Sequence, residues 1–137
     1  MVTVLFACVH NAGRSQMAAA FFNSIADTSR TRALSAGTEP GERIHPVVVD
    51  AMRENGIDLS GARPRHLTPA LAQGVQWLIT MGCGEQCPVV PGVRREDWPV
   101  EDPAGQPLPP VRQIRDDIRR RVEAFVDRES LGAAGHR

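Results

Sequence analysis

The first fifteen residues constrain the fold more than any other part of the chain. A short apolar run, Val2–Ala7, leads directly into Cys8, and a pattern typical of a helix begins near Ser15. An apolar run of this length, rich in β-branched residues, is typical of a strand that is buried on both faces of a parallel sheet. The sequence therefore predicts a strand, loop and helix in which the strand delivers a thiol to the carboxyl edge of a sheet.

Strand and helix patterns continue to alternate along the chain. We expect further strands at 32–36 and 75–81, a fourth short strand within 92–100 near Trp98, and helices at 15–26, 45–55, 68–72 and 111–126. Strands separated by single helices imply right-handed crossovers and a parallel sheet. The predicted fold class is α/β, a single-domain three-layer α/β/α sandwich with a four-stranded parallel sheet. We expect the domain to span 1–130, with 131–137 as a frayed tail.

Composition narrows the classes of function. The 137 residues suit one domain, and 16 basic residues balance 16 acidic ones, so we expect neither a nucleic-acid partner nor an acidic membrane partner. We see no membrane-spanning stretch and no leader, and therefore expect a cytoplasmic protein, which we take to be a monomer. Three cysteines in such a chain favour redox or nucleophilic chemistry over a static disulfide scaffold.

The loop after Cys8 has the residues of an oxyanion cradle. Backbone N–H groups in such a loop can converge on one point, and the start of a helix adds partial positive charge there. Arg14 can place a bidentate guanidinium fork on the same point. The same field stabilises a thiolate at Cys8, to which Ser15 can donate a hydrogen bond. The expected oxyanion-binding residues are Val9, His10, Asn11, Ala12, Gly13, Arg14 and Ser15. A merely packed cysteine would not explain this ordered set.

Two further groups are predicted to lie on the same rim. Cys83 follows the third expected strand and Asp102 follows the fourth, and ligands of parallel sheets bind beyond the carboxyl ends of the strands. A carboxylic acid beside the cradle can protonate a leaving oxygen, so Asp102 is a candidate general acid. From these residues alone an ordinary turn is favoured, because Asp102 and Pro103 form a common turn dipeptide.

Cys83 and Cys87 lie four residues apart in a glycine-bearing loop. On a helical turn they would share one face and could bridge after modest rearrangement. Thiol–disulfide exchange through such a pair can carry electrons away from a buried nucleophile. Zinc is disfavoured because no other cysteine or histidine sits at ligand spacing nearby, so no metal site is expected. Two inert, packed cysteines remain the alternative.

The stretch Cys8–Ala18 resembles the phosphate loop of low-molecular-weight protein tyrosine phosphatases. It is more similar to that of the related arsenate reductases, in which Arg-Ser-Gln-Met-Ala recurs. The stretches 34–38, 79–83 and 102–105 resemble the second strand, the third strand and the general-acid loop of this family. The resemblance extends from the N-terminus to about Val126.

The resemblance implies an arsenate reductase of the thioredoxin-coupled type. Cys8 would attack arsenate, Asp102 would act as general acid, and a relay through Cys83 and Cys87 would follow. No cofactor is expected to be bound, and an external thiol reductant, thioredoxin or mycothiol with mycoredoxin, would close the cycle. The two distal cysteines lie closer together here than is usual in those relatives.

Two alternatives stay open at this point. One is a tyrosine phosphatase that uses Cys8, Arg14 and Asp102 alone. Phosphatases of the family usually carry an aromatic residue after Asp-Pro, where this chain has Ala104, and the chain has no tyrosine, so the reductase is favoured. The other is a non-catalytic oxyanion-binding regulator, which would need neither the thiol nor the Asp-Pro loop.

Overall fold

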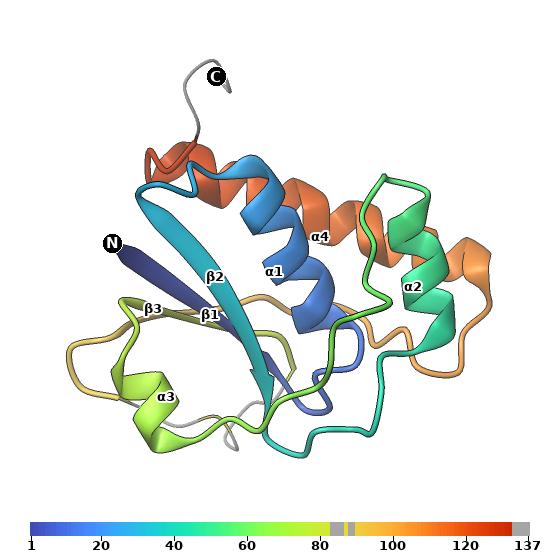
Figure 1. Ribbon diagram of the computed structural model, residues 1–137, viewed down its shortest axis with the longest axis horizontal. Coiled ribbons are helices and arrows are strands. Elements are labelled where there is room, and N and C mark those ends of the chain that lie inside the picture. The colour runs from blue at the N-terminus through green and yellow to red at the C-terminus, as the bar shows by residue number, and fades with distance from the viewer. Residues whose placement is uncertain (83–86, 88–89, 133–137) are drawn as a thin grey trace.

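The computed structural model describes residues 1–82, 87 and 90–132 of the chain (Figure 1). The elements follow the order β1 (Val2–Cys8), α1 (Arg14–Ile25), β2 (Thr31–Gly37), α2 (Pro46–Arg53), α3 (Pro69–Gln73), β3 (Trp77–Thr80), β4 (Arg94–Asp97) and α4 (Leu108–Arg128). The strands form one parallel sheet in the order β2-β1-β3-β4. The predicted α/β class with a four-stranded parallel sheet is confirmed.

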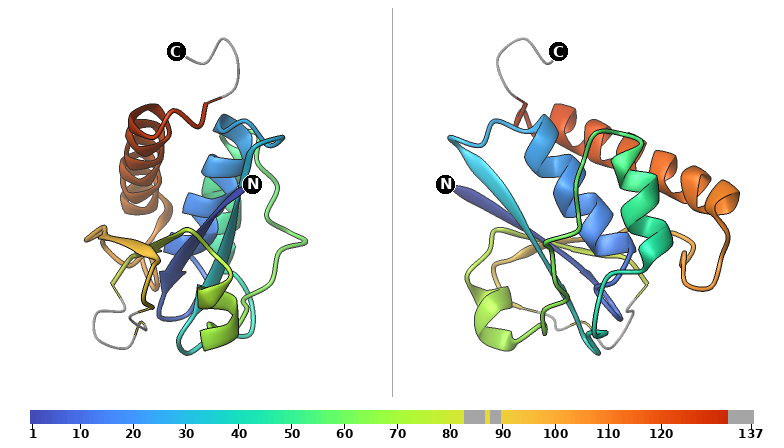
Figure 2. Two further views of the ribbon diagram at one scale, coloured as in Figure 1. Left: turned by 90° about the vertical axis from the view of Figure 1, so that its left-hand side faces the viewer. Right: turned by 45° about the vertical axis from the view of Figure 1, so that its right-hand side comes forward.

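The two faces of the sheet are covered unequally. Helices α1, α2 and α4 pack on one face, and the short α3 covers part of the other (Figure 2). Strand β1 is buried on both faces, because Val4 and Phe6 contact the large core cluster while Leu5 and Ala7 contact the smaller one. Cys8 ends this strand on the side of the large cluster, beneath the start of α1.

Helix α4 is longer than its sequence pattern predicts. It begins at Leu108 rather than 111, because Pro109 and Pro110 fall in the first turn, where a backbone N–H has no intrahelical acceptor. The residues predicted for its buried face are all buried: Val111, Ile114, Ile118, Val122 and Phe125. Within the described residues, no helix is both long and apolar enough to cross a membrane.

Strand β3 is shorter than predicted, and the short fourth strand lies within its predicted range. Strand β3 ends at Thr80, and the next residue, Met81, still donates its N–H to the Ala7 carbonyl at 2.7 Å. The chain then turns away from the sheet at Gly82, which has a φ of +99°. Strand β4 is a run of charged residues at the sheet edge, so hydrophobic periodicity could not mark its ends. The predicted cap of α3 is present: the Thr68 hydroxyl accepts a hydrogen bond from the Leu71 N–H at 3.1 Å.

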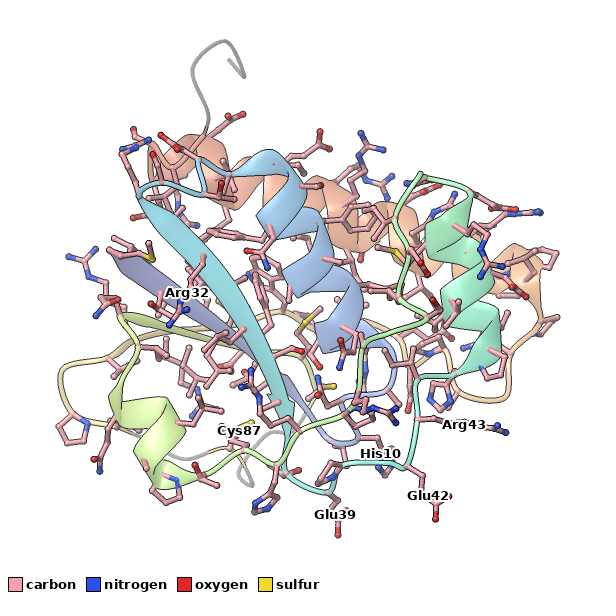
Figure 3. The ribbon with its side chains drawn as sticks, in the orientation of Figure 1. His10, Arg32, Glu39, Glu42, Arg43 and Cys87 are labelled. Atoms are coloured by element: carbon pink, nitrogen blue, oxygen red, sulfur yellow. The ribbon has the colours of Figure 1, made fainter. Side chains whose placement is uncertain are left out.

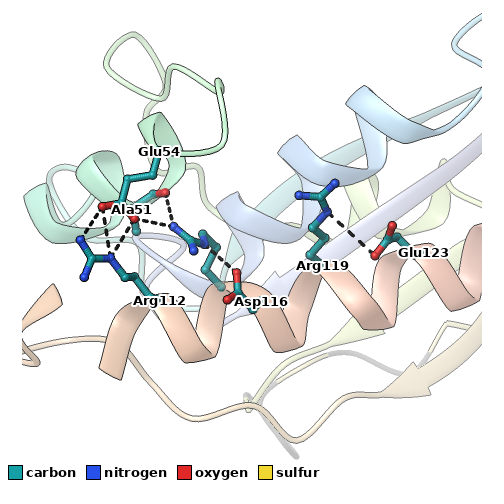
Figure 4. A network of polar contacts seen from close by, with 7 residues as sticks. Ala51, Glu54, Arg112, Asp116, Arg119 and Glu123 are labelled. Carbon is teal, nitrogen blue, oxygen red and sulfur yellow. Dashed lines mark hydrogen bonds and ion pairs between the residues drawn. The ribbon is translucent and has the colours of Figure 1, made fainter. Parts of the chain in front are cut away.

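A buried guanidinium joins α2 to α4. Arg115 donates to the Ala51 carbonyl and to Glu54, both at 2.8 Å, and Arg112 donates to both oxygens of Glu54 (Figure 4). Hydrogen bonds from Arg112 and then Arg115 lower the pKa of Glu54 from 4.5 to about 2. This ionic contact fixes the end of α2 against the helix that completes the core.

Candidate active site

Cys8 lies at the carboxyl end of the central part of the sheet, with only 2% of its surface exposed. Its thiol is free, and its Sγ lies 2.9 Å from the hydroxyl oxygen of Ser15 in the first turn of α1. Strand β1 therefore brings the thiol directly beneath a helix N-terminus. The sulfur thus faces a hydroxyl in the first turn of the helix.

Asn11 is hydrogen-bonded to Ser15, the partner of Cys8. Its side-chain N–H donates to the Ser15 oxygen at 2.7 Å, and the hydroxyl hydrogen of Ser15 stays available to donate to the sulfur. Its side-chain oxygen accepts from Gln16 at 3.1 Å and from the Arg65 N–H at 2.9 Å. Asn11 is fully buried and has a φ of +51°, a conformation that asparagine tolerates well. Asn11 thus anchors the loop to a distant segment.

The loop is held from outside through its carbonyl groups. Four of these carbonyl groups accept hydrogen bonds from backbone N–H groups of the segment 38–45. The Cys8 carbonyl accepts from the Thr38 N–H at 3.1 Å, and the Val9 carbonyl accepts from the Glu39 N–H at 2.8 Å. The His10 carbonyl accepts from the Gly41 N–H at 2.9 Å, and the Ala12 carbonyl accepts from the His45 N–H at 3.0 Å. In a planar trans peptide the N–H points opposite to the C=O, so the following N–H groups point away from that segment. Among the described residues, the N–H groups of residues 9–15 have no protein acceptor. They form a set of donors for an anion.

Arg14 and Asp102 meet above this loop. The two guanidinium N–H groups of Arg14 reach the Val100 carbonyl at 3.3 Å and the Asp102 carboxylate at 3.6 Å. Arg14 is largely buried, with 10% of its side chain exposed, whereas Asp102 is 46% exposed. The guanidinium is therefore oriented by fixed groups, while the carboxylate faces solvent.

The loop that carries Asp102 rests on the cradle. A Cβ atom on Gly13 would lie only 2.7 Å from Cγ of Pro103, so the absence of a side chain there permits this contact. Within its own loop, Asp102 accepts from the Ala104 N–H at 3.0 Å, and its carbonyl accepts from the Gln106 amide at 2.6 Å. These contacts hold the carboxylate near Arg14.

The remaining predicted residues lie as follows. Cys83 is outside the described residues. Cys87 is buried in the smaller cluster, on the α3 side of the sheet. His10 is exposed, and its ring Nδ1 lies 3.0 Å from the Glu39 carbonyl at the surface of the loop (Figure 3). Among the described residues, no group of three or more His, Cys, Asp or Glu side chains is arranged to hold a metal ion.

Three contributors to this site were missed from sequence. Gln16 donates to Asn11 and to the Arg63 carbonyl, Val100 supplies a carbonyl to Arg14, and Gly82 lies against the Arg14 guanidinium. Gln16 follows Ser15 directly and has a detectable signal only as part of the loop motif. Val100 acts through its backbone carbonyl and Gly82 through the absence of a side chain, and neither contribution produces a recognisable sequence motif.

Aromatic side chains do not surround the cradle. All six aromatic residues of the chain pack into the core, and only Trp77 is partly exposed: Phe6, Phe21, Phe22, Trp77, Trp98 and Phe125. Trp77 begins β3 and pairs with Val4, so it lies toward the amino-terminal ends of the parallel strands, whereas Cys8 lies at their carboxyl ends. Within the described residues, no exposed ring at the mouth can stack on an aromatic substrate.

Comparisons with known proteins agree with this geometry. Residues 3–135 match the low molecular weight phosphotyrosine protein phosphatase family. A Halobacterium salinarum relative is 39% identical over 130 residues, which cover 89% of this chain and 89% of that protein. A Synechocystis relative named glutaredoxin arsenate reductase is 35% identical over 129 residues, which cover 92% of this chain and 97% of that protein.

Solved structures extend the similarity to the fold. A thioredoxin-dependent arsenate reductase from Corynebacterium glutamicum superposes with a TM-score of 0.83 and 37% identity over 96% of this chain, which spans 63% of that chain's length. An arsenate reductase in a phosphate-binding state superposes with a TM-score of 0.81 and 32% identity over 93% of this chain and 98% of its own. With its sequence matched nearly from end to end, this chain belongs to the low molecular weight phosphotyrosine protein phosphatase family.

Proposed function

We propose that this protein is an arsenate reductase. The observation that carries the proposal is the buried Cys8 thiol, hydrogen-bonded to Ser15 at 2.9 Å and placed under a loop whose N–H donors have no acceptor among the described residues. Such a cradle suits a tetrahedral oxyanion, and the lack of an exposed aromatic ring at its mouth, in the part of the chain that the structure describes, favours a small inorganic substrate over a phosphotyrosine. The names of the relatives from Synechocystis and Corynebacterium glutamicum support the same choice.

The first step forms a bond between sulfur and arsenic. The loop N–H groups and the Arg14 fork hold three arsenate oxygens, because both present donors to negative charge. The Cys8 thiolate attacks arsenic and an As–O bond breaks. Asp102, which lies 3.6 Å from Arg14, gives its proton to the departing oxygen, which leaves as water. The product is a covalent Cys8–arsenate adduct.

The second step reduces the arsenic. Cys83 attacks the sulfur of Cys8, and the electron pair of the S–As bond leaves with arsenic, which departs as arsenite. A Cys8–Cys83 disulfide remains. Cys87 then attacks Cys83, which frees the Cys8 thiolate and produces a Cys83–Cys87 disulfide. Cys87, which is buried on the α3 side of the sheet, is disulfide-bonded in the structure.

An external thiol completes the cycle by reducing the Cys83–Cys87 disulfide. Thioredoxin is our first choice, because the Corynebacterium glutamicum relative is thioredoxin-dependent. Mycothiol with mycoredoxin is the second. Both would act in the cytoplasm, where we place the protein as a monomer. The phosphatase alternative needs only Cys8, Arg14 and Asp102.

The test compares two activities in the same preparations. Arsenate reduction with a thioredoxin system and hydrolysis of an aryl phosphate are measured for the parent, Cys8→Ser, Cys83→Ser and Cys87→Ser. We expect Cys8→Ser to lose both activities, since both begin with thiolate attack. The two distal variants should lose multiple-turnover reduction and keep any hydrolysis.

Peptide mapping then separates the two distal variants. After one turnover, Cys87→Ser should hold a Cys8–Cys83 disulfide, whereas in Cys83→Ser the Cys8 thiol should remain alkylatable once arsenate is removed. If both distal variants reduce arsenate at the parent rate, the relay is wrong. If the parent hydrolyses the ester but does not reduce arsenate with either thiol system, the phosphatase alternative replaces the proposal.

A further inference from the structure

A groove separate from the mouth above Cys8 runs between α1, β2 and the segment 59–65. Its cavity volume is about 620 Å³, within the range of sites that hold small organic ligands. Ala19, Ala20 and Leu59 supply apolar wall, and Ser35, Arg63 and Arg65 supply polar groups. The chemistry proposed above uses none of these side chains.

At the edge of β2, the backbone N–H and C=O of one residue beside this groove have no partner among the described residues. In a parallel strand, alternate residues direct both backbone groups to the same neighbour, and the odd-numbered residues of β2 face away from β1. Asn23 pairs with both groups of Ala33, at 2.8 and 3.1 Å, and the segment 65–67 pairs with both groups of Gly37 at 2.8 Å. Among the described residues, the N–H and C=O of Ser35 between them have no partner.

The charge of the groove has one sign. Arg63 and Arg65 are both exposed, and within the described part of the chain neither guanidinium takes part in an ion pair or a side-chain hydrogen bond. None of the described residues that line the groove is acidic. Two unpaired guanidinium groups beside a free N–H are suited to a doubly charged anion with several oxygens.

We propose that this groove binds a phosphorylated small molecule. The phosphate would lie against Arg63, Arg65 and the Ser35 N–H, and the organic part would cover Ala19, Ala20 and Leu59. A phosphate ester fits better than inorganic phosphate, because the cavity of about 620 Å³ is much larger than one phosphate group and its remaining wall is mostly apolar, with Gln16 and Asn23 as its other polar residues.

The groove is connected to Cys8 by hydrogen bonds. The Arg65 N–H donates to the Asn11 side-chain oxygen at 2.9 Å, and Gln16 joins Asn11 to the Arg63 carbonyl at 3.1 Å. Asn11 in turn donates to Ser15, which contacts the Cys8 sulfur. A ligand that moves the segment of Arg63 and Arg65 therefore changes the environment of the thiol. This coupling, unlike the binding itself, rests on the proposed role of Cys8.

The binding test uses AMP as the probe and adenosine as its uncharged counterpart. Each is titrated into the ¹⁵N-labelled full chain, and the backbone amide resonance of Ser35 is followed. AMP should shift this resonance saturably and adenosine should not. In the Arg63→Gln/Arg65→Gln double variant, affinity should fall at least tenfold. Arg32→Gln removes an exposed arginine of β2 outside the groove (Figure 3) and should bind AMP like the parent.

The coupling test measures alkylation of Cys8 by iodoacetamide, read from the mass of its peptide, with and without saturating AMP. The rate should change at least threefold in the parent and in Arg32→Gln, and stay unchanged in the double variant. AMP bound in the cradle itself would affect all three proteins equally, and that result would reject the coupling. An unmoved Ser35 resonance in the parent, or a double variant that binds AMP with the parent's affinity, would reject the site. Neither outcome depends on whether the protein reduces arsenate.

Discussion

Gly82 is the position at which the smallest change should most disturb the oxyanion clamp. It lies in the first loop after β3, with a φ of +99°, and it faces the Arg14 guanidinium. A Cβ atom at this position would lie 3.2 Å from Cζ and 3.6 Å from Nη2 of Arg14, and inside contact distance of Nη1. Gly82→Ala should therefore push the guanidinium away from the position set by Val100 and Asp102.

Two costs can be separated in this variant. An alanine in the left-handed region costs about 1–2 kcal/mol of folding free energy, which should lower the melting temperature by about 4 °C per kcal/mol in a chain of this size. To restore ordinary contact with the new methyl group, the guanidinium must move by about 1 Å, and a misplacement of that size costs about a hundredfold in rate. The second cost concerns the reaction alone.

Gly92→Ala provides the matched control. Gly92 has a φ of +83°, but a Cβ atom there would meet nothing within 4 Å. Both variants should lose similar thermal stability, measured by circular dichroism, whereas only Gly82→Ala should lose about a hundredfold in kcat/KM for arsenate and bind phosphate more weakly. If Gly82→Ala loses no more activity than Gly92→Ala, Gly82 does not position Arg14 and the argument fails.

Three further substitutions test the surroundings of the site. Asn23→Ala exposes the paired edge groups of Ala33 and should cost about 1–3 kcal/mol in urea unfolding; a loss near zero would mean that water replaces the amide fully. Gly37→Ala places a methyl group 2.5 Å from the Val9 carbonyl, and should cost about 1–3 kcal/mol and reduce activity; a fully active variant would show that the loop can shift freely. Glu54→Gln should be less stable than the parent at pH 7. Because the pKa of Glu54 is lowered from 4.5 to about 2, the difference should shrink as the pH falls from about 5 to about 2, and a constant difference would contradict the ionic account.

The features that were predictable from sequence are those encoded by neighbouring residues. The strand before Cys8 and the buried face of α4 follow from apolar spacing, which reports burial wherever an element has one or two core faces. The bounds of strand β4 escaped this reasoning, since Arg94–Asp97 is charged throughout and lies at the sheet edge. Its place in the sheet depends on pairing with β3, which a local pattern does not contain.

The candidate site divides in the same way. The order of Cys8, Arg14 and Ser15 could be read directly, because a strand, a short loop and a helix place them together. The contact between the Arg65 N–H and Asn11 joins residues 54 positions apart, and the one between Arg14 and the Val100 carbonyl joins residues 86 apart. Both use a backbone group, which any residue type supplies, so the sequence carries no sign of them.

These distant backbone contacts explain how a loop of small residues can hold its shape before an anion arrives. Four carbonyl groups of the loop are bonded to the segment 38–45, and Asn11 is bonded to Arg65. The N–H groups of the loop thus already point away from these partners when no ligand is bound. The free energy of ordering the loop is therefore spent during folding and not during binding. A preorganised cradle recognises charge and shape but not the group attached to the oxyanion. Under the function proposed above, the choice between reduction and hydrolysis therefore depends on groups outside the cradle: the distal cysteines favour reduction, and among the described residues around the cradle no exposed aromatic ring favours an aryl ester.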